Sequence, residues 1–276
     1  IEKFNVYVDN FRESGKHIGD AHYYLADSYL QLNDTINAIS NFEKSIKATS
    51  GSYKESAASR VSAYYYDLKN YTRALDYYET LEKLSSTPSS IKSARLGIMR
   101  SSFFMEEYEM SKEYALFVLE NPSLNDNIKS EANYAMGLSC YQLEYYMEAI
   151  APLNWLVQNN TTFMGSEAQF TLAQIHFNQK ELETAKLEIQ QLLKMKPSYD
   201  FWIAKGLILM SRILIEEDDL FQAEQNLKAV IEHYPIQDDG VMDEANALWE
   251  EIKILNNPPE DKSVDDTETK IEIDED

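Results

Sequence analysis

Histidine, the residue most often used for acid–base chemistry and metal binding, is rare in this sequence. None of its histidines has a second histidine or a cysteine at the spacing of a metal-ligand pair. The pattern predicts ordinary surface or core side chains and no metal site, and for His176 it favours a packed imidazole over a catalytic base. The four residues are His17, His22, His176 and His233.

The other chemically capable side chains also lack the partners that catalysis requires. Cys140 is the only cysteine, and no histidine lies near it in the sequence to generate a thiolate, so a buried structural thiol is expected. The acidic doublets Glu216–Glu217 and Asp218–Asp219 fall at an expected helix end, where acids cap the following helix. Glycine-rich phosphate loops are absent. We predict a protein that is not an enzyme and needs no cofactor.

The charge of the chain narrows the kinds of partner it can bind. It has 25 Lys and Arg against 47 Asp and Glu, a formal charge of -22. Such a chain repels nucleic acid and anionic lipid. No run of about 18 apolar residues is present, so no membrane-spanning segment is predicted. A protein, a peptide or a glycan therefore remains as the class of partner.

Small residues recur about every 37 residues, which indicates a repeated pair of helices that would position any binding surface. The members of one column are separated by 36, 37, 38, 36 and 38 residues, and two further columns lie on the preceding helices. Small side chains at matched places let antiparallel helices approach closely and stack on the next pair. With few Gly and Pro and many helix formers, the sequence predicts an all-α fold. The first column is Ala38, Ala74, Ser111, Ala149, Ala185 and Ala223; the others are Ala21, Ala57, Ala94, Ala132, Ala168, Gly206 and Ala26, Ser62, Met99, Gly137, Ala173, Ser211.

These columns resemble the tetratricopeptide repeat (TPR) family, most clearly in EAQFTLAQIHFNQKELETAKLEIQQLLKMKP and KGLILMSRILIEEDDLFQAEQNLKAVIEHYP. The resemblance implies a right-handed α-solenoid of about six helix-turn-helix repeats over residues 19–237, starting near 19, 55, 92, 130, 166 and 204. The bulky aromatic that the family has early in the first helix is missing from every unit. The irregular spacing resembles a divergent bacterial cell-envelope type.

The two ends of the chain have separate predicted roles. Residues 1–14 are expected to form the second helix of an earlier, truncated repeat, because apolar residues recur there at helical spacing. Residues 241–255 are expected to form a capping helix over the last repeat. Residues 256–276 contain nine acidic and two basic residues without an apolar stripe, so a disordered acidic tail is predicted.

In a stack of this kind the first helices line the concave face, which makes their groove-facing residues the candidate binding site. Aromatic side chains there could hold an extended or helical peptide, with arginines fixing its acidic groups. The same aromatics could instead only pack neighbouring repeats together. The predicted groove residues are Tyr23, Asp27, Tyr66, Arg100, Phe103, Tyr134, Tyr141, Phe170, Phe177 and Arg212.

We therefore predict a non-catalytic interaction scaffold that binds a partner protein or peptide in its TPR groove. The alternative is a glycan- or peptidoglycan-binding solenoid, in which groove aromatics stack on sugar rings. A monomer or a weak homo-oligomer is expected. The envelope-type resemblance implies assembly work in the periplasm or at the outer membrane, with the cytoplasm as the alternative location.

Overall fold

The computed structural model describes residues 1–11 and 15–256. Within these ranges the chain forms α-helices, and no strand is present. Apart from Asn256, the predicted disordered tail lies outside the described residues. Across the described chain, none of the helices combines the length and apolar character that crossing a bilayer requires.

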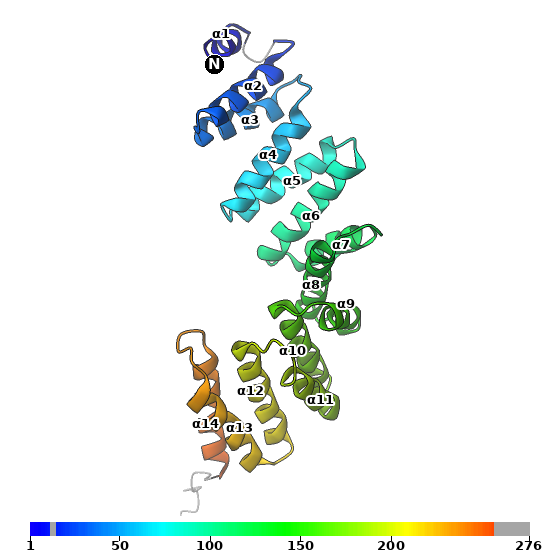
Figure 1. Ribbon diagram of the computed structural model, residues 1–276, viewed down its shortest axis with the longest axis vertical. Helices are drawn as coiled ribbons and strands as arrows, with labels where there is room; N and C mark the ends of the chain where they lie inside the picture. Colours follow the sequence, from blue (N-terminus) through cyan, green and yellow to red (C-terminus); the bar gives the residue numbers. More distant parts are fainter. Residues whose placement is uncertain (12–14, 257–276) are drawn as a thin grey trace, which may run out of the picture. The chain divides into compact units, whose positions relative to one another are not determined.

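The helices follow one another with short connections, as expected for an all-α solenoid (Figure 1). The first seven are α1 (Glu2–Phe11), α2 (Ile18–Gln31), α3 (Thr35–Lys47), α4 (Lys54–Asp67), α5 (Tyr71–Leu84), α6 (Pro88–Phe104) and α7 (Tyr108–Leu119). The next seven are α8 (Asp126–Gln142), α9 (Tyr146–Asn159), α10 (Phe163–Asn178), α11 (Leu182–Leu192), α12 (Asp200–Glu216), α13 (Leu220–His233) and α14 (Val241–Asn256).

The turn inside each helix pair has the same backbone geometry. Its second residue adopts a left-handed conformation with φ between 56° and 63°, although it is never glycine. Left-handed backbone is uncommon for such residues, so its return at every pair is a structural signature of the repeat. In three pairs the next helix is then capped by an Asp or Asn side chain, as in Asp34, which accepts a hydrogen bond from the Asn37 backbone at 3.2 Å. The left-handed residues are Asn33, Lys69, Glu106, Glu144, Lys180 and Asp218.

The small-residue columns lie where helices pack. Every member of the three columns is buried, including Met99, the single large residue among them. Near Met99 the helix approaches its neighbour at Gly97, where an added Cβ would lie 2.3 Å from the Tyr78 ring. Close approach at this point therefore requires glycine.

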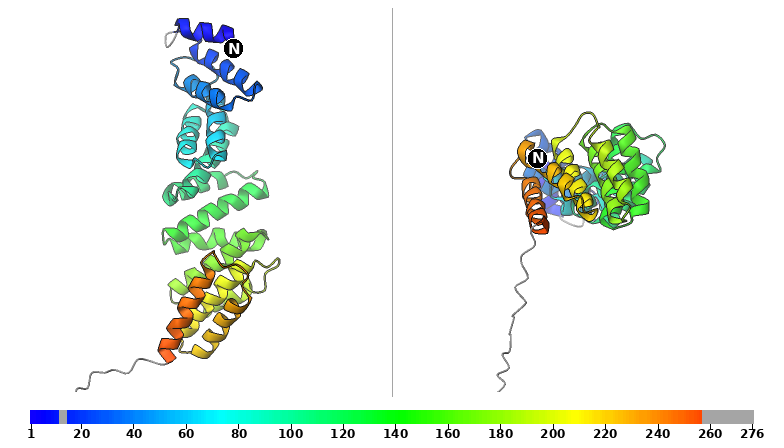
Figure 2. Two further views of the ribbon diagram at one scale, coloured as in Figure 1. Left: turned by 90° about the vertical axis from the view of Figure 1, so that its left-hand side faces the viewer. Right: turned by 90° about the horizontal axis from the view of Figure 1, so that it is seen from below.

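The contacts divide the chain into two units, the first comprising Ile1–Ile175 and the second beginning at His176. In the first unit successive helices pair along the chain, with tyrosines bordering the buried core around Phe42 and Val61. In the second unit α12, α13 and α14 pack against one another around aliphatic residues such as Leu227 and Ile252 (Figure 2).

Pro152 is an irregularity inside α9. The sequence predicts a kink or a late start of this helix, because proline removes a backbone donor. The late start is wrong: α9 begins at Tyr146 and continues through the buried proline to Asn159.

Candidate functional site

Four predicted groove residues meet at one open pocket of about 380 Å³ in the first unit. Tyr66 comes from α4, Arg100 and Phe103 from α6, and Tyr134 from α8. The first turn of α10 closes the pocket with Phe163 and Met164, and Met99, Phe104, Glu131 and Ala135 complete its lining. First helices of successive pairs therefore supply the walls, as the repeat pattern predicts.

Aromatic rings form a continuous series around this pocket. The centroid of Phe103 lies 5.6 Å from that of Tyr134, and Tyr134 lies 6.3 Å from Phe163. On the other side, Phe104 lies 6.4 Å from Tyr66 and stacks on Tyr71 at 4.7 Å. Phe104 and Phe163 are exposed, at 53% and 47%, so their apolar surface faces solvent at the pocket mouth. Exposed aromatic surface beside a recess is suited to holding an apolar side chain of a partner.

The polar groups of the pocket are engaged with each other. The Arg100 Nε donates to Glu131 Oε2 at 2.7 Å, and one of its terminal nitrogens lies 2.5 Å from the same oxygen. This guanidinium therefore already has a carboxylate partner on α8, and its contact with an acidic group of a ligand stays a prediction. The ion pair therefore links α6 to α8.

A second polar pair lies at the wall formed by α8 and α10. The Tyr134 hydroxyl donates to Glu167 Oε2 at 2.7 Å. Burial raises the pKa of both groups, and the Tyr134 hydrogen bond partly counters the rise for Glu167. Tyr134 is thus held in a fixed orientation at the pocket.

Three of the other predicted groove residues in the first unit have different surroundings. Tyr23 stacks on Tyr53 at 4.6 Å, and Asp27 faces Arg60 at 3.8 Å. Phe170 is buried, with 5% of its surface exposed. This ring therefore belongs to the helix packing, and a contact of Phe170 with a ligand stays a prediction.

The remaining three predicted residues are also not brought to the pocket. Tyr141 packs beside Tyr146 against the core cluster that contains Cys140. Phe177 and Arg212 belong to the second unit, where Arg212 pairs with Glu244 at 3.1 Å. Like Arg100, Arg212 already has a carboxylate partner on a neighbouring helix, and its contact with a ligand stays a prediction.

Two functional candidates were missing from the predicted set. Phe104 directly follows Phe103 and therefore fell outside the predicted groove columns. Phe163 precedes the aligned repeat and therefore had no place in the column pattern. The phenylalanine doublet was a usable signal for Phe104, whereas only the packing of α8 against α10 brings Phe163 to the pocket.

The residues considered for catalysis have structural surroundings. Cys140 is fully buried, and burial raises the pKa of its thiol to about 11. The His22 ring lies 3.0 Å from the Asn41 side-chain oxygen, and burial lowers its pKa. The His176 ring lies 2.8 Å from Glu181. Among the described residues, no three side chains of His, Cys, Asp or Glu come together as metal ligands would.

A family model described as tetratricopeptide repeat matches two stretches of the chain, residues 19–51 and 166–199. They correspond to α2 with α3 and to α10 with α11. No curated protein matches the sequence.

Solved TPR structures share the fold. YrrB, described as a TPR protein with an unusual peptide-binding site, has a TM-score of 0.53 and 20% identity over 75% of this chain and 97% of its own. The C-terminal part of a TPR repeat-containing protein from Cytophaga hutchinsonii has a TM-score of 0.54 and 18% identity over 87% and 97% of the two chains. PilF from Pseudomonas aeruginosa has a TM-score of 0.51 and 15% identity over 86% and 97%.

The matched repeats, the paired helices and the buried small-residue columns agree with one another. Residues 19–51 and 166–199 carry tetratricopeptide repeats, and the described chain has the fold of solved TPR proteins.

Proposed function

We propose that this chain is a non-catalytic interaction scaffold that holds a partner peptide at the pocket between α4, α6, α8 and α10. The observation that supports this is the gathering of exposed and half-exposed aromatic rings from successive repeats around one recess of about 380 Å³. Interface energy is concentrated at aromatic residues beside such pockets.

The engaged polar groups define the kind of contact that this pocket offers. Since Arg100 pairs with Glu131 and Tyr134 with Glu167, a ligand meets a surface whose charges are already compensated. Affinity at this pocket then depends on apolar side chains entering between Phe104 and Phe163. A bulky aliphatic or aromatic anchor on the peptide suits this surface.

The test uses peptides that are selected from a displayed random library for binding to the wild-type chain. Phe104→Ala and Phe163→Ala are expected to weaken the selected peptides about tenfold or more, as truncation of a central aromatic does at interfaces. Phe221→Ala is the matched control, because this phenylalanine is 71% exposed on α13 and lies outside the pocket. It should change affinity less than about twofold. Peptides that bind equally well to all three variants would refute the assignment of the pocket.

The non-catalytic part of the proposal has its own test at Cys140. Because this thiol is buried and its pKa is raised to about 11, the folded protein should react with iodoacetamide at pH 8 far more slowly than the urea-unfolded chain. Equal rates in both states would show an accessible, activated thiol and would reopen an enzymatic role.

The division of the chain into repeats is also a proposal. We propose six units in α2 to α13, with α14 as the cap, since Val241, Ala245, Leu248 and Ile252 bury one face of α14. Deleting 241–276 should then expose the core of the last pair and raise its amide exchange. Unchanged exchange in α12 and α13 would contradict the capping role.

An envelope role is a further part of the proposal. PilW, described as a type IV pilus biogenesis factor, has a TM-score of 0.52 and 16% identity over 85% of this chain and 99% of its own. The two proteins are therefore similar in fold. This likeness and the divergent repeats motivate the hypothesis of an assembly factor in the cell envelope. Fractionation of the native cells tests this hypothesis. Recovery of the protein in the cytoplasmic fraction alone would refute it.

A further inference from the structure

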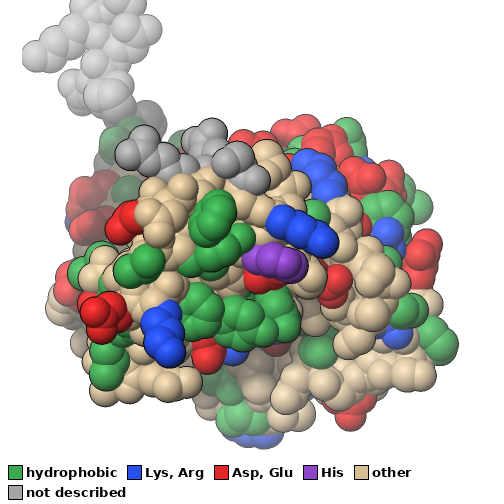
Figure 3. Space-filling model, turned by 90° about the horizontal axis from the view of Figure 1, so that it is seen from above, with side chains coloured by type: hydrophobic (Ala, Val, Ile, Leu, Met, Phe, Trp, Pro, Cys, Tyr) green, Lys and Arg blue, Asp and Glu red, His purple; other side chains and the backbone are tan. Residues whose placement is uncertain are grey.

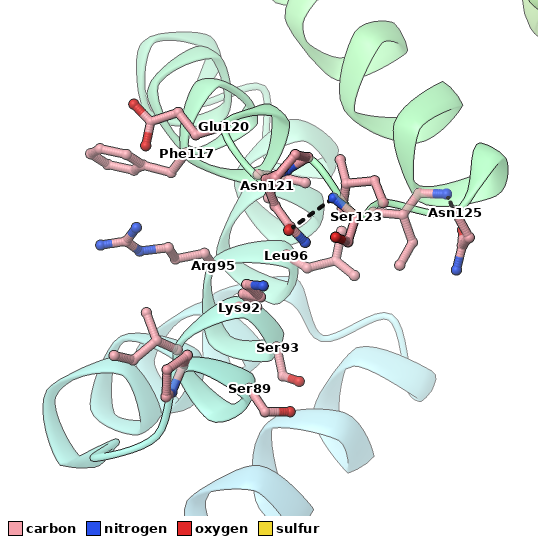
Figure 4. A pocket seen from close by; sticks show the side chains of 16 residues that line it. Ser89, Lys92, Ser93, Arg95, Leu96, Phe117, Glu120, Asn121, Ser123 and Asn125 are labelled. Atoms are coloured by element: carbon pink, nitrogen blue, oxygen red, sulfur yellow. Dashed lines mark hydrogen bonds between the residues drawn. The ribbon is translucent and has the colours of Figure 1, made fainter.

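A second recess lies away from the aromatic pocket, where the start of α6, the end of α7 and the start of α8 meet. It measures about 610 Å³. Residues of α6 form one side, and the connection from Glu120 to Asn125 forms the other (Figure 4). We call this recess the α6–α8 crevice. It shares no residue with the aromatic pocket.

One part of the crevice is apolar and open to a ligand. Its apolar lining residues are Ile91, Leu96, Phe117, Val118, Leu124 and Ile128. The Arg95 guanidinium lies over the Phe117 ring at 4.5 Å while its Nε donates to Glu82 at 2.7 Å. This double contact holds Arg95 and Phe117 in place as a preformed wall.

The other part of the crevice is rich in hydrogen-bond donors. Lys92 is exposed and makes no ion pair or hydrogen bond with any residue that the structure describes. Beside it on α6 are Ser89 and Ser93, and across the crevice are Asn121 and Ser123 (Figure 4). Glu120 is the one acidic residue of the lining, and Figure 4 shows it beside Phe117 and away from Lys92. One backbone donor at each helix start is already used, because Ser90 N donates to Thr87 Oγ1 and Ile128 N donates to Asn125 Oδ1. An unpaired ammonium beside hydroxyl and amide groups favours a carboxylate.

The surrounding geometry favours an extended chain over a compact anion. Ser89 and Ser93 also line a neighbouring polar recess of about 340 Å³ together with Ser56, Ser59 and Arg60. The two recesses therefore border each other along α6. A ligand that uses both must be long and narrow, which describes a peptide segment.

The net charge of -22 sets a limit on how acidic this ligand can be. A polyanion such as nucleic acid is repelled by the chain as a whole, whereas screening over about 8 Å at physiological salt lets one lysine act locally. One or two carboxylates beside an apolar side chain satisfy both conditions.

We propose that the α6–α8 crevice is a second binding site, which takes a short peptide segment with a bulky apolar residue flanked by acidic residues. The apolar residue lies against Phe117 and Leu96, and a carboxylate pairs with Lys92. The site is independent of the aromatic pocket, so each can fail without the other.

Probes for this site are the capped peptide GDLFDG and its neutral counterpart GNLFNG, each labelled and followed by fluorescence anisotropy. GDLFDG should bind about tenfold more tightly than GNLFNG, the difference that one charge-assisted contact supplies. Lys92→Gln should remove that difference. Lys47→Gln, at an exposed lysine on α3 outside the crevice, should preserve it.

Two further measurements place the peptide. Ser93→Trp, at an exposed position on α6, should block both peptides by filling the crevice, with circular dichroism confirming the fold. Phe104→Ala should leave GDLFDG binding unchanged, because Phe104 lines only the aromatic pocket.

The proposal is overturned if GDLFDG fails to bind at millimolar concentration, if GNLFNG binds equally well, or if Lys92→Gln and Ser93→Trp have no effect. It is also overturned if inorganic phosphate at equal concentration displaces the peptide completely, since the site would then select a compact anion.

Discussion

The two units of the molecule build the same helix pairs from different side chains. In the first unit tyrosines border the buried clusters and donate to carboxylates of neighbouring helices, as Tyr65 does to Glu43 at 2.8 Å. In the second unit aliphatic residues such as Leu227, Val230 and Ile252 fill the core, and lysines pair with glutamates at the surface. Aliphatic side chains pack without polar atoms, whereas each buried tyrosine needs a partner for its hydroxyl.

This difference offers a reason for where the two proposed binding surfaces lie. Rings are large and rigid, so aromatic walls leave recesses that smaller, flexible side chains would close. Both the aromatic pocket and the α6–α8 crevice belong to the first unit. The α1 end of this unit shows the same character: hydrophobic side chains gather around a histidine with basic side chains beside them (Figure 3). Phe4, Tyr7, His17 and Tyr24 line a recess of about 480 Å³ there.

The largest expected effect comes from emptying the core of each unit at the same repeat position. Phe42→Ala should lower the free energy of unfolding by about 3–5 kcal/mol and Leu227→Ala by about 2–5 kcal/mol, because both side chains are fully buried. Urea unfolding measures the loss, and hydrogen exchange locates it. Each substitution should raise exchange mainly in its own unit.

Exposed neighbours provide controls for these two variants. Ile36→Ala on α3 and Phe221→Ala on α13 remove side chains that are 78% and 71% exposed, so about 0.5 kcal/mol or less is expected. Exchange that rises equally in both units after Phe42→Ala would show one shared core and break the comparison.

A smaller loss of stability is expected when a glycine is replaced by alanine, and its size should depend on whether the added methyl group meets a rigid ring or a flexible aliphatic side chain. At Gly97 an added Cβ would lie 2.3 Å from the Tyr78 ring, whereas at Gly206 it would lie 3.0 Å from the end of Leu192. Gly97→Ala should therefore destabilise by about 1–3 kcal/mol, while Gly206→Ala should cost less because Leu192 can move. Thermal unfolding gives the order, and the reverse order would contradict this account.

The Tyr134 hydrogen bond offers a pH-dependent test of the aromatic unit. Burial raises the pKa of Glu167, so its effect on stability is most favourable below the unfolded pKa and is lost as pH rises through the raised value. Tyr134→Phe removes the hydrogen bond that lowers this pKa, so the pKa should rise further. At neutral pH we expect a loss of about 1–2 kcal/mol, shrinking as the carboxyl is protonated.

Carbon-13 NMR titration of the Glu167 carboxyl measures the shift directly. Tyr64→Phe is the control, because the Tyr64 hydroxyl has no hydrogen bond with the residues that the structure describes. A Glu167 pKa that falls in Tyr134→Phe would show that the Tyr134 hydrogen bond does not favour the ionised carboxylate.

The smallest effect is expected at the surface of the second unit. Lys180 and Glu216 form an ion pair at 2.9 Å with the lysine side chain 69% exposed. Lys180→Ala should change stability by less than about 1 kcal/mol, and 1 M salt should erase the difference from wild type. A larger loss that persists in high salt would mean that surface charges, and not the aliphatic core, hold this unit together.

Much of the fold followed from periodicity, and rather less of the site did. The columns containing Ala38, Ala74 and Ala223 predicted which faces pack, and these residues are fully buried. Side chains on those faces are buried between closely packed helices, so a small residue type there indicates a packing position. At the groove an aromatic ring can be buried in the packing, as Phe170 is, or exposed to solvent, as Phe104 is, and its residue type does not distinguish the two.

The sequence by itself determined that the chain forms repeated helix pairs without a recognisable catalytic motif, because helical spacing and small-residue contacts are local and recur. Only the tertiary structure decided which charges are free. Arg100 and Arg212 are paired with glutamates more than thirty residues away, whereas Lys92 has no partner in the described chain. Such pairing depends on the distances between helices, which the spacing of residues along one chain does not contain.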